Sequence, residues 1–421
     1  MATVKEFSAL RFTDAAGDIS QLVCAPYDII SEEQRKNYIN QNEHNVIRLE
    51  LPVGEDRYNE AGKILNEWLS SGILAVDDED ALYIYEEAFS VKGVDYAFKG
   101  FVSRVKLHEF SEGVVLPHEE TLSKAKQDRF NLMTATGCNF SQIYSLYSDE
   151  KGEADKLIAK LSSGAPAHSF TDPDGVTHSL WIAKKSADTE ALCRFFDDKK
   201  LYIADGHHRY ETALNYKKSL AEQGVTCEAA DYIMMFLVSM QSSGLVVFPT
   251  HRIVRDLAEF DRDALLAECS EYFEVEKLGC EHCIEGRLEE LYSNNKTAFG
   301  YVDKDSAYLL TLKDISVMDS VLPDKSKDLS RLDVSVLHSL ILERVLKIDK
   351  ENMAKQINLT YTRDLEEAFS AAKNTADCCF ILNPTRVSEI AAVATNDEKM
   401  PQKSTYFYPK LITGLVMNKI K

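Results

Sequence analysis

The sequence gathers several reactive side chains in one short segment, residues 201–214 (LYIADGHHRYETAL). Four apolar or small residues predict a strand that stops before Asp205 and Gly206, and the apolar spacing that follows predicts a helix beginning close to His208. The N-terminus of a helix presents unpaired N–H groups and a partial positive charge, so it attracts anions. The segment therefore predicts a site for phosphate or for a nucleotide.

Each polar residue of this segment has a role that such a site needs. Gly206 lets the backbone approach a ligand closely. Arg209 can hold a phosphate through two parallel hydrogen bonds, and His207 or His208 can donate a hydrogen bond or move a proton. Asp205 can bind a Mg²⁺ ion carried by the nucleotide, or accept a proton from a hydroxyl. The structural alternative is a capped helix behind a glycine turn, but so many adjacent polar groups favour a functional site.

Other polar clusters are candidates for the same site. Asp28 follows a predicted strand at residues 22–25, and a predicted strand at residues 45–51 would place Arg48 and Glu50 on one face, where they could instead pair with each other. The charge run at 117–129 is otherwise a solvated loop and helix start. Predicted binding residues are Gly206, His208, Arg209, Arg48, His118, Thr121, Arg129, His251, Arg252 and Lys403; predicted catalytic residues are Asp205, His207, His208, Asp28 and Glu50.

Two of these clusters lie late in the sequence. Residues 249–252 (PTHR) come directly after a predicted strand, and we expect them in a loop, where functional residues often occur. Lys403 and Lys410 lie in a polar segment near the C-terminus and are further candidates for contact with phosphate. Neither cluster predicts a site without the segment at 201–214.

The pattern of predicted elements indicates a mixed α/β protein of the α+β class. A helix follows Ser31, a hairpin turns near Gly93, and from about residue 255 the character of the sequence changes. We therefore predict a core with the candidate site at residues 1–255 and a C-terminal α/β module at 256–421, whose tail would complete the site. The predicted elements of this module are helices at 258–272, 334–345, 365–373 and 387–395 and strands at 298–302, 308–312, 356–361 and 378–382.

Composition limits the classes of partner. The chain has 421 residues and a formal net charge of −20, and no basic run is visible. A nucleic-acid coat and an anionic membrane surface are therefore poor partners, because both need a basic face. We expect a nucleotide and a small-molecule substrate as partners, and a homodimer stays open.

The cysteines and the N-terminal sequence predict a cytoplasmic protein. Nine scattered cysteines fit reduced thiols better than a disulfide framework. The first residues lack the pattern of a signal peptide, and no apolar run approaches the roughly 18 residues of a spanning helix. Cys280 and Cys283 have the spacing of half a zinc site, but no second pair follows at finger spacing. The sequence also lacks the glycine-rich loop of P-loop proteins and the serine elbow of hydrolases.

Nearly the whole chain resembles the bacterial domain-of-unknown-function family 1015. The likeness rests on matching segments in order along the sequence, which are residues 26–28, 45–52, 118–121, 128–129, 205–212, 249–252 and 400–410. The resemblance identifies a family but implies no activity by itself.

The segment from Asp205 to Ala213 also looks like the phosphate loop of the ParB/sulfiredoxin-like superfamily, which includes free-serine kinases, CTP-binding partition proteins and sulfiredoxins. The resemblance implies a ParB/sulfiredoxin-like core in which Gly206, His208 and Arg209 hold nucleotide phosphates. His207 stands where sulfiredoxins have their reactive cysteine, so that chemistry lacks its nucleophile here.

The leading functional prediction is a phosphotransferase that uses ATP or ADP with Mg²⁺ and acts on a small hydroxylated metabolite such as free serine. Such a kinase needs a carboxylate base, for which Asp28, Glu50 and Asp205 are the candidates. Two alternatives stay open: a nucleotide-binding regulatory protein without catalysis, and a hydrolase of a phosphorylated small molecule with a histidine as acid or base.

Overall fold

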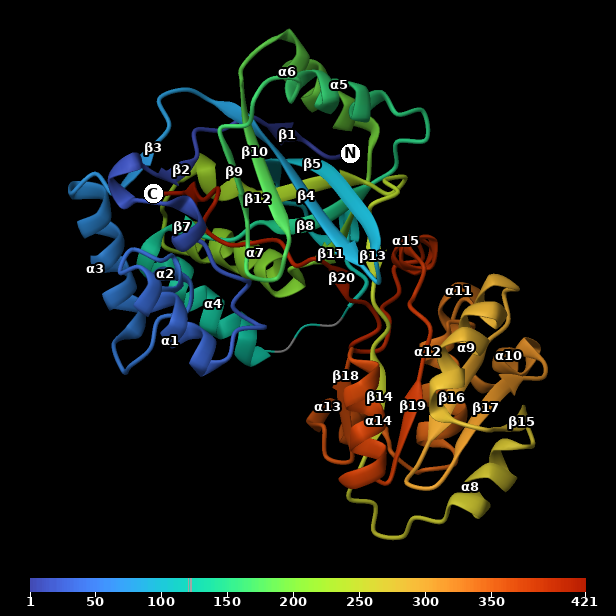
Figure 1. Ribbon diagram of the computed structural model, residues 1–421. Coiled ribbons are helices and arrows are strands. Elements are labelled where there is room, and N and C mark those ends of the chain that lie inside the picture. Colours follow the sequence, from blue (N-terminus) through green and yellow to red (C-terminus); the bar gives the residue numbers. More distant parts are fainter. Residues whose placement is uncertain (120, 122) are drawn as a thin grey trace. The chain divides into compact units, whose positions relative to one another are not determined.

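The computed structural model describes residues 1–119, 121 and 123–421, and these residues form two compact units (Figure 1). Unit 1 comprises Met1–Pro117, Thr121–Val246 and Pro409–Lys421, and unit 2 comprises Val247–Tyr408 with His118 and Glu119. The division into domains at residues 1–255 and 256–421 remains a prediction. None of the described helices is long and apolar enough to cross a membrane.

A large mixed sheet forms the centre of unit 1, which confirms the predicted mixed α/β class. Its strand order is β6-β11-β8-β12-β5-β4-β10-β9, and β1 pairs with β5. The hairpin predicted around Gly93 is β4 and β5. The strands of this sheet are β1 (Val4–Lys5), β4 (Ala81–Val91), β5 (Val94–Lys106), β6 (Val115–Leu116), β8 (Ile143–Tyr147), β9 (His168–Thr171), β10 (Thr177–Lys184), β11 (Leu201–Asp205) and β12 (Tyr232–Ser239).

Helices and short strands surround this sheet. The helices of unit 1 are α1 (Glu32–Gln41), α2 (Ile47–Glu50), α3 (Arg57–Ser70), α4 (Ser123–Thr136), α5 (Glu153–Leu161), α6 (Ala187–Phe195) and α7 (His207–Glu222). Two small pairings join β2 (Leu10–Phe12) to β3 (Leu74–Val76) and β7 (Cys138–Asn139) to β21 (Asn418–Lys419). Strand β13 (Val246–Val247) lies where the chain passes from unit 1 to unit 2, and β20 (Phe407–Tyr408) belongs to unit 2.

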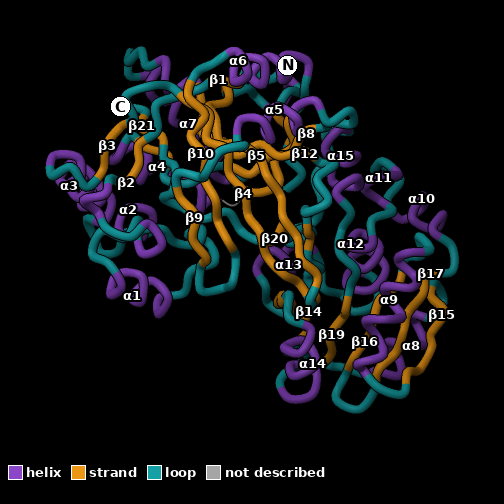
Figure 2. The backbone as a smooth tube through the Cα atoms, turned by 45° about the horizontal axis from the view of Figure 1, so that its top comes forward, coloured by secondary structure: helices purple, strands orange, loops and turns teal. Residues whose placement is uncertain are grey.

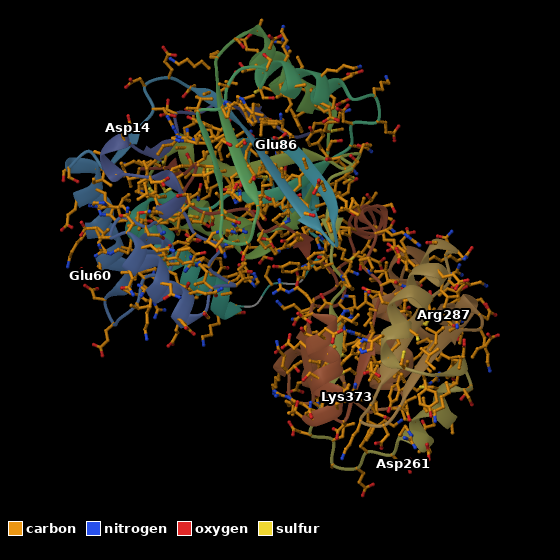
Figure 3. All side chains as sticks on the ribbon, in the orientation of Figure 1. Asp14, Glu60, Glu86, Asp261, Arg287 and Lys373 are labelled. Atoms are coloured by element: carbon orange, nitrogen blue, oxygen red, sulfur yellow. The ribbon has the colours of Figure 1, made fainter. Side chains whose placement is uncertain are left out.

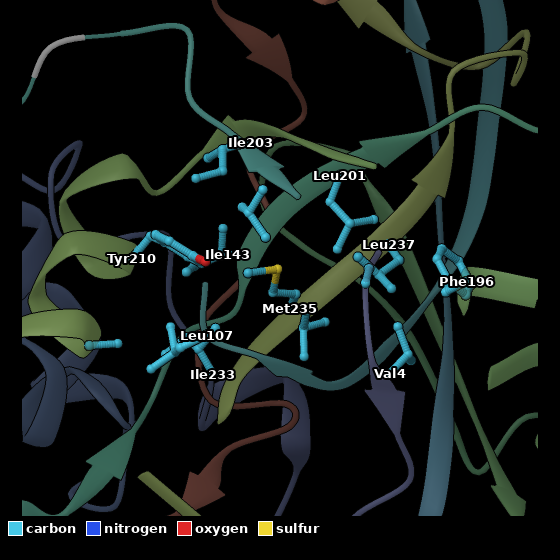
Figure 4. Close-up of a cluster of buried hydrophobic side chains, with 14 of the residues drawn as sticks. Val4, Leu107, Ile143, Phe196, Leu201, Ile203, Tyr210, Ile233, Met235 and Leu237 are labelled. Atoms are coloured by element: carbon cyan, nitrogen blue, oxygen red, sulfur yellow. The ribbon is translucent and has the colours of Figure 1, made fainter. Parts of the chain in front are cut away.

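Strand β12 in the middle of this sheet is buried on both faces, where its alternate side chains point to opposite sides. Ile233, Met235 and Leu237 of β12 pack in one core cluster (Figure 4), and Phe236 between them contacts the rings of Tyr144 and other aromatic residues. Tyr210 of α7 packs in the same core cluster as Ile233, Met235 and Leu237. Its hydroxyl donates to the carbonyl oxygen of His108 at 2.8 Å. Helix α7 is therefore fixed to the sheet immediately after its first turn.

Two strand predictions in unit 1 are wrong. Residues 45–51 contain α2 instead of a strand, since the side chain of Asn45 accepts a hydrogen bond from the N–H of Ile47 at 2.9 Å and starts the helical turn. A short, mostly apolar segment satisfies helix and strand patterns equally. Residues 22–25 form only a single bridge, in which Cys24 pairs with Thr413.

Unit 2 contains a six-stranded antiparallel sheet of order β15-β17-β16-β19-β14-β18, which Figure 2 shows as orange tubes. Its strands are β14 (His251–Val254), β15 (Phe273–Leu278), β16 (Ala298–Val302), β17 (Ala307–Leu312), β18 (Leu359–Thr362) and β19 (Cys378–Ile381). Its helices are α8 (Arg262–Cys269), α9 (Ile284–Ser293), α10 (Met318–Val321), α11 (Lys327–Ser330), α12 (Asp333–Val336), α13 (Lys350–Lys355), α14 (Leu365–Asn374) and α15 (Val387–Thr395).

The loop predicted at residues 249–252 is partly wrong, because His251 and Arg252 begin strand β14, which lies between β19 and β18 in the sheet. Strands β18 and β19 pair with β14 on either side and extend its backbone through both residues. The sequence gives no sign of this pairing, since both partner strands lie more than a hundred positions later.

Candidate functional site

The strand–turn–helix predicted at residues 201–214 is present in unit 1. Strand β11 ends at Asp205, where the pairing with β8 shifts register, and α7 begins at His207. Gly206 between them has a φ of +98°, in the left-handed region, and α7 has no side-chain hydrogen bond at its N-cap. A β-bulge of this kind changes the direction of a side chain at a strand end. The N-cap residue of α7 is therefore a glycine, which has no side chain to bond the first N–H groups of the helix.

Two cations bind the carboxylate of Asp205. Its Oδ2 lies 2.7 Å from Nη2 of Arg209, and its Oδ1 pairs with Lys410 from the C-terminal segment of unit 1. Burial acts to raise the pKa of Asp205, but Lys410 and Arg209 outweigh burial and hold that pKa well below its usual range. Asp205 is therefore a fixed anion whose two oxygens both face cations, which suits neither a proton acceptor nor a metal ligand.

Arg209 is held between two parts of unit 1. Its Nη1 donates to the carbonyl oxygen of Gln142 at 2.6 Å while Nη2 contacts Asp205. A Cβ atom added to Gly206 would lie 3.0 Å from Nε and Nη2 of Arg209. The guanidinium group thus lies directly over the glycine turn, with an orientation that its two partners set.

The two histidines have different environments. His207 is buried, with 4% of its surface exposed, whereas His208 is half-buried. Burial lowers the pKa of His208 more than Glu211 and Asp28 raise it, so its imidazole is neutral near pH 7. Glu211 also pairs with Lys126 at 2.6 Å. His208 is the histidine of this segment that can exchange a proton with a ligand.

A second cluster surrounds Glu50, which is 3% exposed. Arg129 donates from Nη1 to the backbone oxygen of Glu50 at 2.8 Å and lies 3.6 Å from its Oε1, and the hydroxyl of Ser141 donates to the same carboxylate at 3.0 Å. Arg129 also pairs with Asp128 at 2.6 Å, and its guanidinium carbon lies 4.1 Å from the centre of the Tyr27 ring. The cluster therefore joins α2, α4 and the segment before α1.

The two clusters meet at a small cavity of 30 Å³ that Glu50, Arg129 and Arg209 line together. A cavity of this size holds one water molecule. Burial raises the pKa of Glu50 more than Arg129 and Arg209 lower it. Glu50 is thus a carboxylate that binds a proton more readily than an exposed glutamate, and it lies beside the guanidinium of the turn.

Of the remaining predicted residues of unit 1, Asp28 and Thr121 lie near this site, whereas Arg48 makes a contact elsewhere. Asp28 is exposed but acts on the pKa of both Glu50 and His208, and Thr121 donates from Oγ1 to Glu211 at 2.8 Å. Arg48 instead donates to the backbone oxygen of Glu43 at 3.0 Å. The predicted pairing of Arg48 with Glu50 on one strand face is wrong, because both residues lie on a helical turn.

Four predicted binding residues belong to unit 2. His118 is 1% exposed and its Nε2 lies 2.9 Å from Oγ1 of Thr405, while Nδ1 of His251 accepts from the backbone N–H of Leu382 at 3.3 Å. Arg252 is buried and donates from Nη2 to the backbone oxygen of Lys403 at 3.3 Å. These four residues belong to unit 2, whereas the cluster around Asp205 belongs to unit 1.

Sequence reasoning did not select Ser141, Lys126 and Glu211 as site residues. Glu211 lies within the segment at 201–214, and Lys126 lies within the charge run, so both were visible as polar neighbours of chosen residues. Ser141 carries no sequence pattern at all. Its contact with Glu50 arises only because the chain before β8 passes beside α2.

The fold and this cluster define a mixed α/β protein with a charged turn before a helix. The chain belongs to the family described as "Protein of unknown function (DUF1015)", whose family model matches residues 4–335. This confirms the resemblance noted from the sequence. No curated protein matches the chain.

Solved structures with a similar arrangement include a mutant free serine kinase in complex with ADP, with 13% identity over 75% of this chain and 90% of that chain and a TM-score of 0.38. A conserved hypothetical protein from Pyrococcus furiosus has 14% identity over 71% and 88% of the two chains, with a TM-score of 0.33. SbnI from Staphylococcus aureus, truncated at its C-terminus, has 11% identity over 75% and 86%, with a TM-score of 0.36. At these TM-scores the likenesses carry no argument about function.

Proposed function

We propose that unit 1 binds the phosphates of ATP or ADP at the turn around Gly206 and transfers a phosphoryl group to a small hydroxylated metabolite. The observation that carries the proposal is the start of α7, where the N-cap residue is Gly206 and the guanidinium group of Arg209 lies over the turn. Backbone N–H groups at a helix start and a guanidinium group together favour an anion with several oxygen atoms. The 30 Å³ cavity takes only water, so the nucleotide would lie outside it, over the turn.

Glu50 is our candidate for the base. The hydroxyl oxygen of the acceptor would attack the terminal phosphorus, and the bond from that phosphorus to the leaving oxygen would break. Glu50 would take the hydroxyl proton through a water molecule in the 30 Å³ cavity that it lines. Its raised pKa supports this choice. Asp205 is the weaker candidate, because Lys410 and Arg209 stabilise its charged form. His208, neutral near pH 7, is a second group able to move a proton.

Magnesium enters the proposal only as an ion that the nucleotide carries. Both oxygens of Asp205 face cations, so this carboxylate does not fit the role of a Mg²⁺ ligand. Among residues 1–119, 121 and 123–421, no group of three or more His, Cys, Asp or Glu side chains could hold a metal ion. The chain's own contribution is therefore to hold phosphate and to move the proton.

The test is to incubate the full chain with Mg-ATP or Mg-ADP and a panel of hydroxylated metabolites that begins with free serine, and to detect phosphorylated product by mass spectrometry. Arg209→Gln should lower kcat/KM roughly tenfold to a hundredfold, the value of a hydrogen bond to a charged group. The control is Arg194→Gln, which alters an exposed arginine on α6 and should leave the rate unchanged.

Each other outcome points to one of the alternatives. Nucleotide binding without consumption would favour a regulatory protein, and release of phosphate without an acceptor would favour a hydrolase. No nucleotide binding at all, or equal behaviour of Arg209→Gln and the parent, would overturn the proposal.

A further inference from the structure

Unit 2 contains a cavity of its own, of 360 Å³. Its volume falls within the roughly 300–1,000 Å³ typical of small-molecule sites. The wall comes from the start of β14, the end of α9, the start of α12 and the segment after β19. Its charged residues include Arg252, Arg331 and Arg386, together with Asp333 and Glu389. It shares no residue with the site around Asp205.

Arg252 on this wall is a buried cation without an acidic partner. Only 1% of its surface is exposed, and among the residues that the structure describes no Asp or Glu forms an ion pair with it. Its Nη1 donates to the backbone oxygen of Thr250, its Nη2 reaches the backbone oxygen of Lys403 at 3.3 Å, and its guanidinium carbon lies 5.4 Å from the centre of the Tyr361 ring. Nε of Arg252 has no hydrogen-bond partner in the structure.

Arg252 also contacts His338, whose Nε2 lies 3.4 Å from Nη2. Burial, and then the charge of Arg252, lower the pKa of His338 well below its ordinary value, so the imidazole is neutral and supplies no counter-charge. Burial also lowers the pKa of Arg252, to about 10, which leaves the guanidinium charged near pH 7. A buried charge without a counter-ion is costly, and native proteins normally pair it.

Arg331 and Arg386 face the same cavity. Nε of Arg331 is also buried without a partner, although its Nη2 pairs with Asp319 at 3.0 Å outside the wall. Arg386 lies 4.0 Å from the centre of the Tyr292 ring and donates from Nη2 to the backbone oxygen of Tyr292 at 2.6 Å. Arg252, Arg331 and Arg386 therefore place three guanidinium groups on the wall of one cavity.

The acidic residues of the wall interact with arginines other than Arg252. Oε1 of Glu389 lies 3.5 Å from Nη1 of Arg386, and hydrogen bonds from Ser316, followed by the charge of Arg331, lower the pKa of Asp314. Glu389 is occupied at the start of α15, where its Oε2 accepts from the backbone N–H of Arg386 at 2.8 Å. Burial raises the pKa of Asp333 to about 7, so a large fraction of this carboxyl is uncharged near neutral pH. Thr250, Asn383 and Thr385 contribute neutral polar groups that suit the hydroxyl or amide groups of a metabolite.

We propose that this cavity of unit 2 binds a small molecule through an oxyanion, a carboxylate or a phosphate, with Arg252 and Arg331 as its counter-ions. The oxyanion supplies the negative charge that Arg252 lacks on a wall that also carries Arg331 and Arg386. The inference does not depend on the proposed function of unit 1, since the two sites have no residue in common.

The test uses the full chain carrying Arg209→Gln, which removes the candidate phosphate contact of unit 1. Inorganic phosphate and succinate are titrated separately by calorimetry, so that the two anion types are distinguished. Hydrogen exchange of peptides covering residues 250–254 and 383–389 locates the binding. We expect saturable binding of at least one anion, with slower exchange of these peptides.

Arg331→Gln is the decisive variant, because its side chain is partly exposed and the fold tolerates its loss more readily than that of Arg252. It should weaken binding at least tenfold, and Arg252→Met should abolish binding if that variant folds. Arg287→Gln, an exposed arginine of unit 2 labelled in Figure 3, is the matched control and should bind like the parent. Failure of both anions to bind, or parent-like binding by Arg331→Gln, would overturn the inference.

Discussion

Two carboxylates of unit 1 show how the surroundings of a residue determine its chemistry. Glu50 is buried, and Nη1 of Arg129 lies 3.6 Å from its Oε1. Burial raises the pKa of Glu50 more than this cation lowers it. Asp205 has Arg209 at 2.7 Å and Lys410 on its other oxygen, and the two cations lower its pKa. Because a useful base must bind a proton and then release it, Glu50 is the better candidate of the two.

Glu50→Gln tests this assignment at the scale of one residue. If Glu50 is the base, kcat should fall by roughly 10²–10⁴-fold, and the rise in rate with pH through the raised pKa of Glu50 should disappear. The pH dependence of kcat/KM between pH 4.5 and 8 measures both effects. Glu86→Gln, which removes a half-buried carboxylate paired with Lys99 at 3.1 Å, is the control. An unchanged pH profile would remove Glu50 from the mechanism.

Gly206→Ala tests the turn itself. The left-handed conformation at φ +98° costs an alanine about 1–2 kcal/mol, and the added Cβ would press on Arg209 at 3.0 Å. Gly175→Ala is a matched control, because Gly175 has φ +82° with open space around it. We expect similar losses of unfolding free energy in the two variants but weaker nucleotide binding only in Gly206→Ala. Equal nucleotide affinity in both would separate Arg209 from the ligand.

Strands β4 and β10 carry a buried network of polar side chains that is separate from the proposed site. Tyr85 donates from its hydroxyl to Glu87 at 2.7 Å, and the same oxygen lies 2.6 Å from Nδ1 of His178, whose Nε2 lies 3.1 Å from Asp172. A doubly protonated His178 satisfies all three bonds, since both ring nitrogens then donate. The pairing of the two strands holds these groups in register.

This network makes the stability of the element depend on pH. Burial acts to lower the pKa of His178, but its bonds to Asp172 and Glu87 outweigh burial and raise that pKa to about 9. A raised pKa stabilises the fold fully below about pH 6.5, and the stabilisation, on the order of 3 kcal/mol, is lost as the pH rises through about 9.

Urea unfolding of the parent and of His178→Gln at pH 6 and pH 9.5 checks this prediction. The parent should lose stability between the two values, and the variant should be less stable than the parent at pH 6 and change less with pH. His282→Gln, an exposed histidine of unit 2, should behave like the parent. An equal pH dependence in parent and His178→Gln would contradict the assigned protonation.

At the scale of the whole chain, the C-terminal segment Pro409–Lys421 is part of unit 1. It brings Lys410 to Asp205, and β21 pairs with β7. Asn418 is fully buried there, accepting from Nε of Arg104 and donating to the side-chain oxygen of Asn139, both at 2.8 Å. Parts of the sequence several hundred positions apart thus complete one unit.

Asn418→Ala should therefore destabilise unit 1 although it removes only one small side chain. It leaves buried polar groups of Arg104 and Asn139 without their partner, at a cost of about 1–3 kcal/mol. The free energy of unfolding, measured in urea, gives the size of the loss. Asn374→Ala is the control, since Asn374 is an exposed asparagine of α14 that bonds only its own helix. A loss no larger than that of the control would show that the segment contributes little.

Local patterns in the sequence determined much of the secondary structure. The strand and helix around Gly206, the hairpin of β4 and β5, and the helix after Ser31 follow from alternation, helical spacing and capping residues close together in the chain. The family was also readable from motifs in order along the chain.

Only the tertiary structure decided which of these groups meet. Lys410 reaches Asp205 and Ser141 reaches Glu50 through contacts between distant segments, and α2 replaced an expected strand because Asn45 bonds the backbone of its neighbours. Arg252, expected in a loop, lies in strand β14, which pairs on both sides with strands far along the chain. Sequence patterns report what a residue does within a few positions, whereas burial and charge pairing depend on packing between remote segments.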